Sequence, residues 1–578
     1  MQKKPTVLGI LHLGRDPTAC LIKDGKIIAM AEEERFLRIK HAEGYFPKYA
    51  IKFCLEQANI KLKDVDSIAI GWDVNAYPKR MAIHFLKTWY QYPTKDKKTL
   101  DWEIKQLETF NPESYSKEIV EQLIKCGYNR DDIPEIVFKP HHYSHAVSAY
   151  LASGFKEASI LVMDGHGEEN ATTLWYAKGN KITKIKEINI PHSLGWFYAA
   201  FTKFTGFKIY DGEGKTMGLA PYGKPNKKFR EYVCQMLKIN EECYEIDPSY
   251  LFYGKRTIVD EFSDKFAEAF GAYRGGDKDE IKGHHKDAAY EAQRRLEEVS
   301  LHLAEVLIKK TGCRNLCIAG GVGLNCKMNG CIYKSDLVEN IFIQPVSGDD
   351  GTVLGASMAV YLENGLDTTG FKMDNVYFGP SFSNHDIEIE LKNFGLKYNK
   401  VDNIEELTAK CLAEGKIVGW FQGRMEVGPR ALGSRSILAD PRDPKMKDKV
   451  NAKVKFRESW RPFCPSILYE DIDKYLEKPC FHPFMILTFH IKKDMKDKIP
   501  SVVHVDGTAR PQTVRKENNE RYWKLLNEFK KLTDIPMILN TSFNIKGEPI
   551  VCNPKDAINC FLKTDIEVLA IGDFIIKK

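Results

Sequence analysis

Two widely separated segments of this 578-residue chain share one pattern, in which a short apolar run leads into a glycine-containing loop and a second strand follows. In the first segment, residues 6–30 contain two strand-like runs around the loop 14–18, with a turn at 23–26. In the second, the apolar run 159–164 ends at Asp-Gly, and a returning strand is predicted at 171–176. Apolar runs bounded by such loops are typical of strands. The repeat predicts two related strand, loop, strand units.

Helices alternate with strands in the region that follows the second unit. From 288 to 310 apolar residues recur with the helical period of about 3.6 residues, and the pattern stops at Gly312. A strand is predicted at 316–319, and the chain returns through the apolar run 341–345. This alternation favours an α/β layered domain. Together with the repeated unit, it is the outline of the actin-like ATPase fold, in which two related halves face a cleft.

The chain is too long for a single hydrophobic core, so two or three domains are expected. A fresh α/β pattern starts with a helix at 385–394, after a loop-forming stretch. We therefore predict an N-terminal domain at 1–378 and a C-terminal domain at 385–578. Two polar, irregular and aromatic-bearing stretches are interpreted as insertions in the first domain, at about 85–125 and about 225–285.

Composition narrows the class of protein. Hydrophobic residues make up 43% of the chain, as in soluble globular proteins, and the sequence has no apolar stretch of the roughly 18 residues that a membrane span needs. The N-terminus shows no signal-peptide pattern, so we expect a cytoplasmic protein. Fourteen cysteines stand singly, which suits a reducing compartment. A formal charge of +6 neither demands nor excludes a nucleic-acid partner.

Two histidines and two aspartates form a candidate metal site. His141 and His145 are four residues apart, so a helix would place both on one face. Asp164 ends a strand-like run, and Asp349 follows the last strand of the same region, so both carboxylates can face the histidines. Two nitrogen and two oxygen donors favour iron(II), manganese or zinc, and spacing alone does not choose among them. The alternative is a histidine pair that is merely packed in a core.

Two glycine-rich loops are candidates for binding phosphate. Gly165 lies in one loop, and Gly320 and Gly321 lie in the other. Each loop follows a predicted strand, which lets backbone N–H groups approach phosphate oxygens. Neither loop is a Walker A sequence or a GxGxxG dinucleotide motif. Asn325, on the helix that follows, could bind a ligand, and a role on the helix surface is equally compatible.

A series of motifs then matches one known pattern. The runs are 32–36 with 40–41, 141–145, 164–168, 215–223, 319–325, 428–433, 504–510 and 540–544. In this order they resemble the NodU/CmcH family of O-carbamoyltransferases, and the match extends from about residue 8 to the C-terminus. Coincidence is a poor explanation for so many separate motifs in the correct order.

The resemblance implies an enzyme with two sites. The actin-like domain would hold iron(II) on the four candidate ligands, with Asp349 as the last ligand and Asp350 as its near rival. The C-terminal domain would be a twisted α/β sheet of the threonylcarbamoyl-adenylate-synthase type, which makes a carbamoyladenylate from carbamoyl phosphate and ATP with Mg. The carbamoyl group would then pass to a metal-activated acceptor hydroxyl. A homodimer is also compatible with the family.

The second site is expected around two short pairs. Lys455 and Arg457 form a KxR pair and Ser542 and Asn544 form an SxN pair, which resemble those of the adenylate-forming domain. A planar guanidinium matches phosphate oxygens, so nearby arginines are expected to grip carbamoyl phosphate and ATP. These arginines are Arg424, Arg430, Arg435, Arg461 and Arg510. The alternative is a set of solvated arginines paired with acids such as Glu426 and Glu458.

One departure from the family pattern concerns the first loop. It has Arg15-Asp16 where the family has His-Asp, so His12, His41 or Arg15 must take over the role of that histidine. The acceptor stays open between a natural product or sugar hydroxyl and a hydroxymethylated base in nucleic acid. Four aromatic residues of the first insertion could stack on it, or could simply cover the insertion: Trp89, Tyr90, Tyr92 and Trp102.

A function from another class also fits part of the sequence. An actin-like protein could bind nucleotide and switch conformation without transferring any group. Such a switch has no need of a second anion site, so the KxR and SxN pairs favour the transferase.

Overall fold

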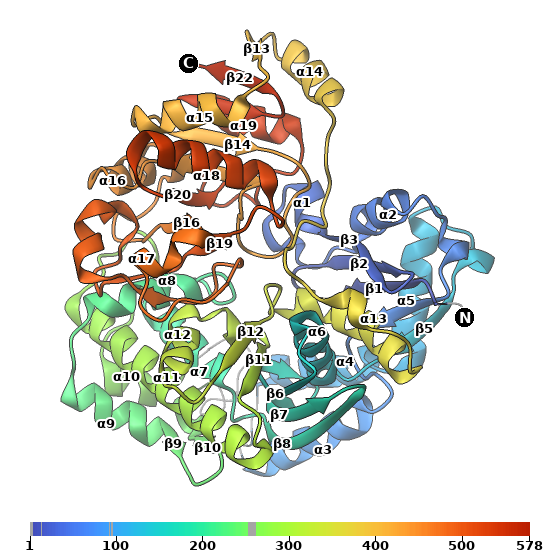
Figure 1. Cartoon of the computed structure of the whole chain (residues 1–578). Coiled ribbons are helices and arrows are strands. Elements are labelled where there is room, and N and C mark those ends of the chain that lie inside the picture. Colours follow the sequence, from blue (N-terminus) through green and yellow to red (C-terminus); the bar gives the residue numbers. More distant parts are fainter. Residues whose placement is uncertain (1–3, 13, 92, 94–95, 252–261) are drawn as a thin grey trace. The chain divides into compact units, whose positions relative to one another are not determined.

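The computed structural model describes residues 4–12, 14–91, 93, 96–251 and 262–578. The chain divides into two compact units that are interleaved in the sequence. Unit 1 comprises Met1–His12, Thr18–Ile28 and Phe46–Lys372, and unit 2 comprises Leu13–Pro17, Ala29–Tyr45 and Met373–Lys578. Two short N-terminal segments therefore belong to unit 2, including the blue helix α1 (Glu33–Leu37) in Figure 1. None of the helices in the described ranges combines the length and apolarity that crossing a membrane requires.

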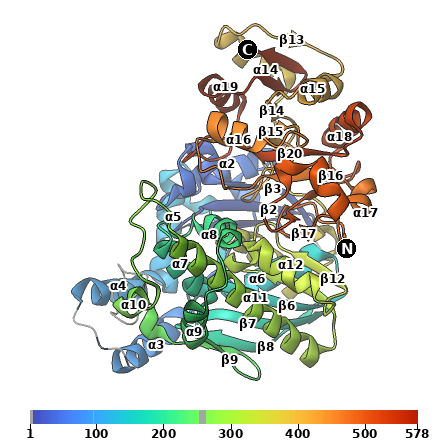
Figure 2. The same cartoon turned by 90° about the vertical axis from the view of Figure 1, so that its left-hand side faces the viewer.

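Unit 1 is built on two five-stranded sheets with the same topology. The strand orders are β3-β2-β1-β4-β5 and β8-β7-β6-β11-β12. In each, the central strand has an antiparallel neighbour on one side and a parallel neighbour on the other, which is followed by a second parallel strand. The duplicated, actin-like α/β arrangement is thus confirmed. Figure 2 shows β6, β7 and β8 of the second sheet side by side.

The strands of the first sheet are β1 (Val7–Leu11), β2 (Thr18–Lys23), β3 (Lys26–Glu32), β4 (Ser67–Ile70) and β5 (Glu135–Phe138). Those of the second are β6 (Glu157–Gly167), β7 (Asn170–Lys178), β8 (Lys181–Asn189), β11 (Asn315–Ala319) and β12 (Asn340–Ile343), and β9 (Leu237–Ile239) and β10 (Tyr244–Ile246) form a separate pair. The helices of unit 1 are α2 (Lys48–Gln57), α3 (Tyr77–Gln91), α4 (Lys97–Thr109), α5 (Pro112–Lys125), α6 (His141–Ser153), α7 (Leu194–Phe204), α8 (Glu213–Leu219), α9 (Lys227–Met236), α10 (Asp264–Phe270), α11 (Gly283–Thr311), α12 (Cys326–Lys334) and α13 (Thr352–Glu363).

Helices α6 and α13 form the layer between the two sheets of unit 1. Helix α13 packs on β1 and β4, helix α6 packs on β6 and β11, and the two helices pack on each other. A Cβ added at Gly355 would stand 1.8 Å from the Ser144 carbonyl oxygen, and one at Gly9 would stand 2.3 Å from the Val353 carbonyl oxygen. These contacts require glycine, because no other residue lets the backbones approach so closely. The first turn of α6 is thereby held against α13, and α13 against the first sheet.

The interpretation of 85–125 as irregular was wrong. This stretch carries the end of α3 and all of α4 and α5, and Asp96 and Asn111 accept hydrogen bonds from backbone N–H groups at the starts of α4 and α5. Such N-caps, with Pro112 at the first turn of α5, are local helix signals. In the second stretch, Phe266 and Phe270 are buried against Phe201. Tyr92 and residues 252–261 lie outside the described residues.

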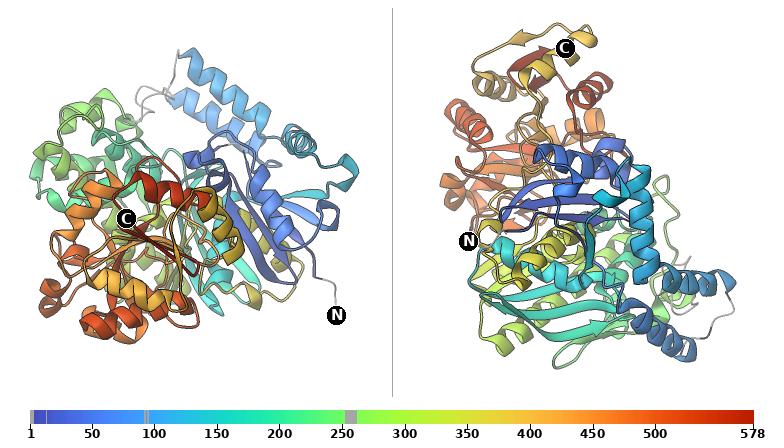
Figure 3. Two further views of the ribbon diagram at one scale, coloured as in Figure 1. Left: turned by 90° about the horizontal axis from the view of Figure 1, so that it is seen from above. Right: turned by 90° about the vertical axis from the view of Figure 1, so that its right-hand side faces the viewer.

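Unit 2 is a mixed α/β sheet of eight strands in the order β13-β22-β21-β14-β15-β20-β16-β19, which confirms the predicted α/β sheet of the C-terminal half. Figure 3 shows its orange and red strands fanned by the twist. The strands are β13 (Asn399–Lys400), β14 (Val418–Phe421), β15 (Arg435–Ala439), β16 (Cys464–Leu468), β19 (Gln512–Val514), β20 (Met537–Ser542), β21 (Val568–Ile571) and β22 (Phe574–Lys577), with β17 (Phe489–His490) and β18 (Thr508–Ala509) as a separate pair. The helices after residue 373 are α14 (Asn384–Asn393), α15 (Ile404–Ala413), α16 (Met446–Val450), α17 (Ile472–Tyr475), α18 (Glu520–Thr533) and α19 (Pro554–Lys563).

Candidate functional site

The four predicted metal ligands lie together in unit 1. His141 begins α6 and shares one face of it with His145, Asp164 stands near the end of β6, and Asp349 lies in a short turn after β12. One ligand atom from each of the four lies within 4.8 Å of the others. His141 Nε2 is 3.1 Å from His145 Nε2, 3.3 Å from Asp164 Oδ2 and 3.5 Å from Asp349 Oδ1. Two imidazoles and two carboxylates therefore converge on one point.

Neighbouring groups orient these side chains. His141 Nδ1 donates to the Gly71 carbonyl at 3.0 Å, which leaves Nε2 directed at the cluster. The buried Glu168 carboxylate accepts the backbone N–H of His141 at 3.2 Å and that of Asp73 at 2.7 Å. The Gly321 N–H donates to Asp164 Oδ1 at 2.9 Å. The cluster is thus held by the backbone of both sheets of unit 1.

The electrostatics of the cluster suit a cation. Burial lowers the pKa of His141, but the carboxylates of Asp349 and Asp164 outweigh burial and raise it well above its ordinary value. Burial and then His141 lower the pKa of His145 to about 4. Burial opposes ionisation of Asp164, yet its hydrogen bond with His141 and the nearby imidazoles hold its pKa below the usual range. A proton on His141 balances the carboxylates in this arrangement, and a divalent cation can take its place.

Two tryptophans beside the cluster were missed by the sequence reasoning. The Trp72 ring lies 4.5 Å from the His141 ring, and the Trp196 ring lies 5.3 Å from the His166 ring. Both indoles are only partly buried, and both pack against one apolar cluster that contains Tyr77. They are far apart in the sequence and belong to no short motif, so no local signal marks them. We refer to these two indoles as the aromatic wall: Trp72 lies beside the candidate ligand His141, and Trp196 lies beside His166, two residues after Asp164.

Two of the aromatic residues considered for acceptor binding, Trp89 and Trp102, make contacts within the first insertion. Trp89 Nε1 donates to Glu103 at 2.5 Å, and the Trp102 ring packs against the Phe85 ring. These contacts tie α3 to α4, so both tryptophans serve to pack the insertion. Tyr90 is 91% exposed and Trp102 is 38% exposed. The geometry agrees with the alternative that these residues cover the insertion.

The glycine-rich loops lie at the ends of neighbouring strands of the second sheet. Gly320 has φ +87°, and a Cβ there would stand 2.2 Å from the Met163 carbonyl oxygen. The backbones of Gly165 and Gly195 also approach each other closely, since a Cβ on Gly195 would stand 2.8 Å from the Gly165 nitrogen. Asn325 does not point an open amide at a ligand, because its side chain pairs with Gln293 and caps α12. The Gly321 N–H is likewise used inside the fold, because it donates to Asp164 Oδ1. What these loops offer a phosphate is close approach to the glycine backbone.

The two candidate histidines of the first loop belong to different units. His12 is 2% exposed in unit 1, between the rings of Phe46 and Tyr115, and burial lowers its pKa to about 3. Neither of its ring nitrogens has a hydrogen-bond partner among the described residues. His41 lies in unit 2, where its Nδ1 is 2.9 Å from Asp16 Oδ1.

The KxR and SxN pairs meet in unit 2. Lys455 Nζ lies 3.1 Å from Ser542 Oγ and 2.6 Å from Asn544 Oδ1, and it also contacts the backbone carbonyls of both residues. Lys455 ends a π-helical turn and precedes Phe456, which has φ +47°. Turns of this kind and left-handed non-glycine residues concentrate at functional sites. Two motifs almost ninety residues apart thus form one site.

Cations accumulate around Lys455, and Glu458 lies among them, 3.9 Å from Arg461 Nη1. Burial and then the charge of Arg457 lower the pKa of Lys455 well below its ordinary value. Burial and then the charge of Arg461 lower the pKa of Arg457, and the charge of Arg510 lowers it further. Arg510 points Nε and Nη2 at Cys464 Sγ, at 3.1 and 3.0 Å. A bound anion would relieve this repulsion, so the arrangement fits a phosphate-bearing ligand.

The remaining predicted arginines have different roles. Arg435 is fully buried, its guanidinium donates to carbonyl groups such as that of Gln422, and it stacks 3.7 Å above the Phe421 ring. The expectation that Arg435 grips phosphate was therefore wrong, because its donors are used inside the fold. Arg424 donates to the carbonyls of Phe378 and Gly379 at 2.5 and 3.2 Å.

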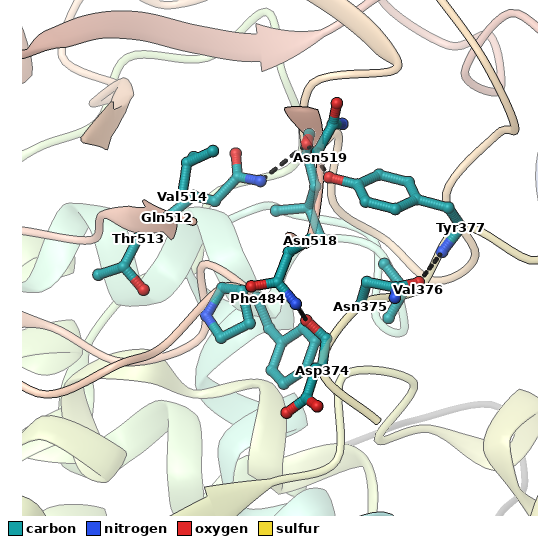
Figure 4. A pocket seen from close by; sticks show the side chains of 12 residues that line it. Asp374, Asn375, Val376, Tyr377, Phe484, Gln512, Thr513, Val514, Asn518 and Asn519 are labelled. Atoms are coloured by element: carbon teal, nitrogen blue, oxygen red, sulfur yellow. Dashed lines mark hydrogen bonds between the residues drawn. The ribbon is translucent and has the colours of Figure 1, made fainter. Parts of the chain in front are cut away.

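Arg430 is half-buried on the loop 428–433. Tyr377 and Gln512 both donate to the Leu432 carbonyl at 2.7 Å, so they hold the end of this loop (Figure 4). The small pocket in Figure 4 is lined by Asp374, Asn375, Val376, Tyr377, Leu432, Pro483, Phe484, Gln512, Thr513, Val514, Asn518 and Asn519. It contains none of the predicted site residues.

A duplicated actin-like unit with a cluster of two histidines and two aspartates, and an α/β unit with cationic side chains gathered around Lys455, define the class of this protein as a two-unit α/β protein with a candidate metal centre and a candidate anion site. The family described as Carbamoyltransferase N-terminus matches residues 6–358, and the one described as Carbamoyltransferase C-terminus matches residues 409–578. The chain belongs to the carbamoyltransferase family. The resemblance to NodU-type proteins is confirmed, and the protein is a transferase.

Relatives share this architecture over most of their length. The uncharacterized protein sll1178 of Synechocystis is 38% identical over 607 residues, which cover 99% of this chain and 96% of the relative. The nodulation protein NolNO of Sinorhizobium fredii is 36% identical over 97% of this chain and 79% of the relative. The nodulation protein NolO of Bradyrhizobium diazoefficiens is 39% identical over 76% of this chain and 78% of the relative.

Proposed function

We propose that this protein is an ATP-dependent O-carbamoyltransferase that works in two steps. The observation that carries the proposal is the meeting of Lys455 with Ser542 and Asn544, with Arg457 and Arg461 close by. A nucleotide-dependent switch would not need this second anion site. Membership of the carbamoyltransferase family supports carbamoyl transfer as the chemistry.

The first step would take place in unit 2. Water releases phosphate from carbamoyl phosphate, the resulting carbamate oxygen attacks the α-phosphorus of ATP, and pyrophosphate leaves with its Mg. Lys455 and Arg457 would bind the negative charge that develops on the expelled pyrophosphate, and Arg430, Arg461 and Arg510 would hold the phosphates. Ser542 and Asn544 would orient the carbamoyladenylate through their hydroxyl and amide groups. Arg424 would shape the wall of the site through the carbonyls it binds.

The second step would take place in unit 1. The acceptor oxygen attacks the carbamoyl carbon, the bond from that carbon to the AMP phosphate oxygen breaks, AMP leaves, and the hydroxyl proton is released. Gly165, Gly320 and Gly321 would let the AMP phosphate approach the backbone closely, while the Gly321 N–H stays bonded to Asp164. His12 or His41 would fill the role of the first-loop histidine. Trp72 and Trp196 would bind the ring of the acceptor, for which a small molecule or sugar is the first choice and a hydroxymethylated base the alternative.

The residues of unit 1 fit a divalent transition ion such as iron(II). His141, His145, Asp164 and Asp349 supply two nitrogen and two oxygen donors, and the Gly71 carbonyl already orients one imidazole. When bound, such an ion lowers the pKa of a coordinated hydroxyl and so favours its attack at neutral pH. We also propose a cytoplasmic location, since none of the fourteen cysteines forms a disulfide.

The decisive experiment needs no acceptor. The protein is incubated with ATP, Mg and carbamoyl phosphate, and mass spectrometry follows carbamoyladenylate, phosphate and pyrophosphate. All three are expected to form. If folded, metal-loaded protein forms neither carbamoyladenylate nor pyrophosphate, the adenylate step is wrong and the nucleotide switch becomes the function to test.

The Trp196→Ala variant is expected to bind its acceptor more weakly. Loss of one stacked aromatic contact should raise KM for the acceptor about 10-fold, since such contacts are worth up to about 1.5 kcal/mol. The measurement is carbamoyl transfer to whichever member of a panel of sugars, sugar alcohols and hydroxymethylated oligonucleotides the wild type uses. Pyrophosphate formation without acceptor should stay at the wild-type rate. Trp102→Ala is the matched control, and an equal KM in both variants would contradict the aromatic wall as the acceptor site.

A further inference from the structure

An N-terminal segment packs with the C-terminal part of the chain. Residues Ala29–Tyr45 belong to unit 2, although more than three hundred residues separate them from its main part, Met373–Lys578. We name this segment the clasp. It contains the end of β3, helix α1 and a short helical turn at Lys40–Ala42. Its side chains contact the two loops that carry the predicted anion-binding residues.

The first contact of the clasp is with the loop 428–433, which carries Arg430. Glu32 Oε1 accepts the Gly428 N–H at 2.5 Å, and Arg35 Nη2 donates to the Gly428 carbonyl at 2.9 Å. Both side chains are 4% exposed, and Arg35 Nε lies 3.4 Å from Glu32 Oε2. A buried ion pair thus binds both polar atoms of one glycine, which has φ +88°. Such charge-assisted bonds define the start of the loop much more tightly than an apolar contact.

The second contact is with the loop that follows the SxN pair. Arg38 donates to the Ile550 carbonyl at 2.5 Å and to the Pro549 carbonyl at 2.8 Å, and its Nε lies 3.6 Å from Asp556. Phe36 packs against an apolar cluster that joins the two loops, formed by Met425, Ala431, Ile550 and Cys552. The same loop is tied to the SxN pair, because Asn544 Nδ2 donates to the Glu548 carbonyl at 2.7 Å.

The clasp then enters a strained turn. Arg38, His41 and Ala42 have φ of 59°, 64° and 37°, in the left-handed region that non-glycine residues rarely adopt. The turn is held by Asp16, whose backbone N–H donates to the His41 carbonyl at 2.9 Å, and by Glu34, which accepts the His41 N–H at 2.6 Å. Lys40 lies between the strained residues, and its charge acts on Lys455.

We propose that the clasp completes the adenylate-forming site, with Glu32, Arg35 and Arg38 as positioning residues for its two loops and Lys40 as a further cation for the polyphosphate of ATP. The inference rests on the proposed function. It assigns to the N-terminal part of the chain a role in the chemistry of unit 2. A fragment that begins at Met373 would therefore lack part of its own active site.

The test compares arginines with similar surroundings. Arg38→Met removes two donors to loop carbonyls, and Arg442→Met is the control, because Arg442 also pairs with an acid and donates to the Ala413 carbonyl. Arg38→Met should lower the acceptor-free rate of pyrophosphate formation about 100-fold at saturating substrates, and Arg38→Lys should recover part of it. Arg442→Met should alter the melting temperature only. A melting temperature that falls in Arg38→Met with an unchanged rate would overturn the positioning role.

Lys40 is tested through binding as well as turnover. Lys40→Met should raise KM for ATP about 10-fold with kcat unchanged, and should weaken binding of pyrophosphate, measured by calorimetry, by the same factor. Lys453→Met is the matched control, since Lys453 is exposed near Lys455. Equal pyrophosphate affinity in wild type and Lys40→Met would refute the assignment of Lys40. Calorimetry needs no turnover, so this result stands apart from a failure of the proposed function, which would appear as wild-type protein that makes no carbamoyladenylate.

Discussion

Replacement of Lys455 by alanine is expected to reduce formation of carbamoyladenylate and pyrophosphate about 1,000-fold, measured without acceptor. Lys455 is 5% exposed, and its amine contacts four oxygen atoms of Ser542 and Asn544. It therefore lies at the centre of the cationic side chains. A preorganised cation that faces charge developing in the transition state is worth roughly 3–4 kcal/mol. The alanine variant lacks this cation, and a water molecule in its place would stabilise the developing charge less strongly.

The control for this variant is Lys453→Ala, in the same π-helical turn. Lys453 is exposed, so its removal tests the effect of one lost surface charge. Its rate should stay within about twofold of the wild type. Metal content and melting temperature are measured in both variants, because unit 1 should be unaffected. If well-folded Lys455→Ala keeps more than a tenth of the wild-type rate, Lys455 does not stabilise the departing pyrophosphate.

The second large effect is expected from Asp164→Asn, which should abolish carbamoyl transfer but leave carbamoyladenylate formation intact. Asparagine can still accept the Gly321 N–H at Oδ1, so the loop contact survives. The negative charge beside His141 and His145 is lost, and with it an anionic ligand. Metal content, measured by plasma mass spectrometry after dialysis, should fall below stoichiometric. Transfer should fall on the order of 1,000-fold, since a bound ion contributes several kcal/mol.

Asp349 and Asp350 provide the matched pair for this test. Asp349→Asn should also lower metal content, because Asp349 belongs to the group of four side chains, whereas Asp350→Asn should retain it. A metal content that depends on Asp350 instead would identify the neighbouring aspartate as the ligand. If Asp164→Asn also stops pyrophosphate formation in folded protein, the separation of the two steps between the units is wrong.

Much of the fold could be predicted because its signals are local. The strand, loop, strand repeat, the helix that ends at Gly312 and the helix expected at 385–394 all correspond to observed elements, the last of them α14. The insertion 85–125 was misjudged, since its polar surface hid helix signals such as the Asp96 and Asn111 caps. The assignment of two N-terminal segments to unit 2 was not predicted. Hydrophobic periodicity does not show which unit a segment packs with.

The candidate site was predicted where side-chain type alone restricts the chemistry. Two imidazoles at helical spacing and carboxylates at strand ends predict a metal site, and the structure brings the four side chains together. Arginine is less informative, because the same guanidinium serves anions or backbone carbonyls. Arg435 is the example, since only its burial beneath the fold shows that it binds carbonyls.

The sequence by itself determined the duplicated α/β class, the four metal-ligand candidates and the KxR and SxN pairs, because periodicity and residue chemistry are properties of short segments. Only the tertiary structure decided that Lys455 meets Ser542 and Asn544, that Trp72 lies beside His141 and Trp196 beside His166, and that the clasp belongs to unit 2. These are contacts between segments far apart in the chain. They follow from how the sheets and helices pack, and no local pattern encodes them.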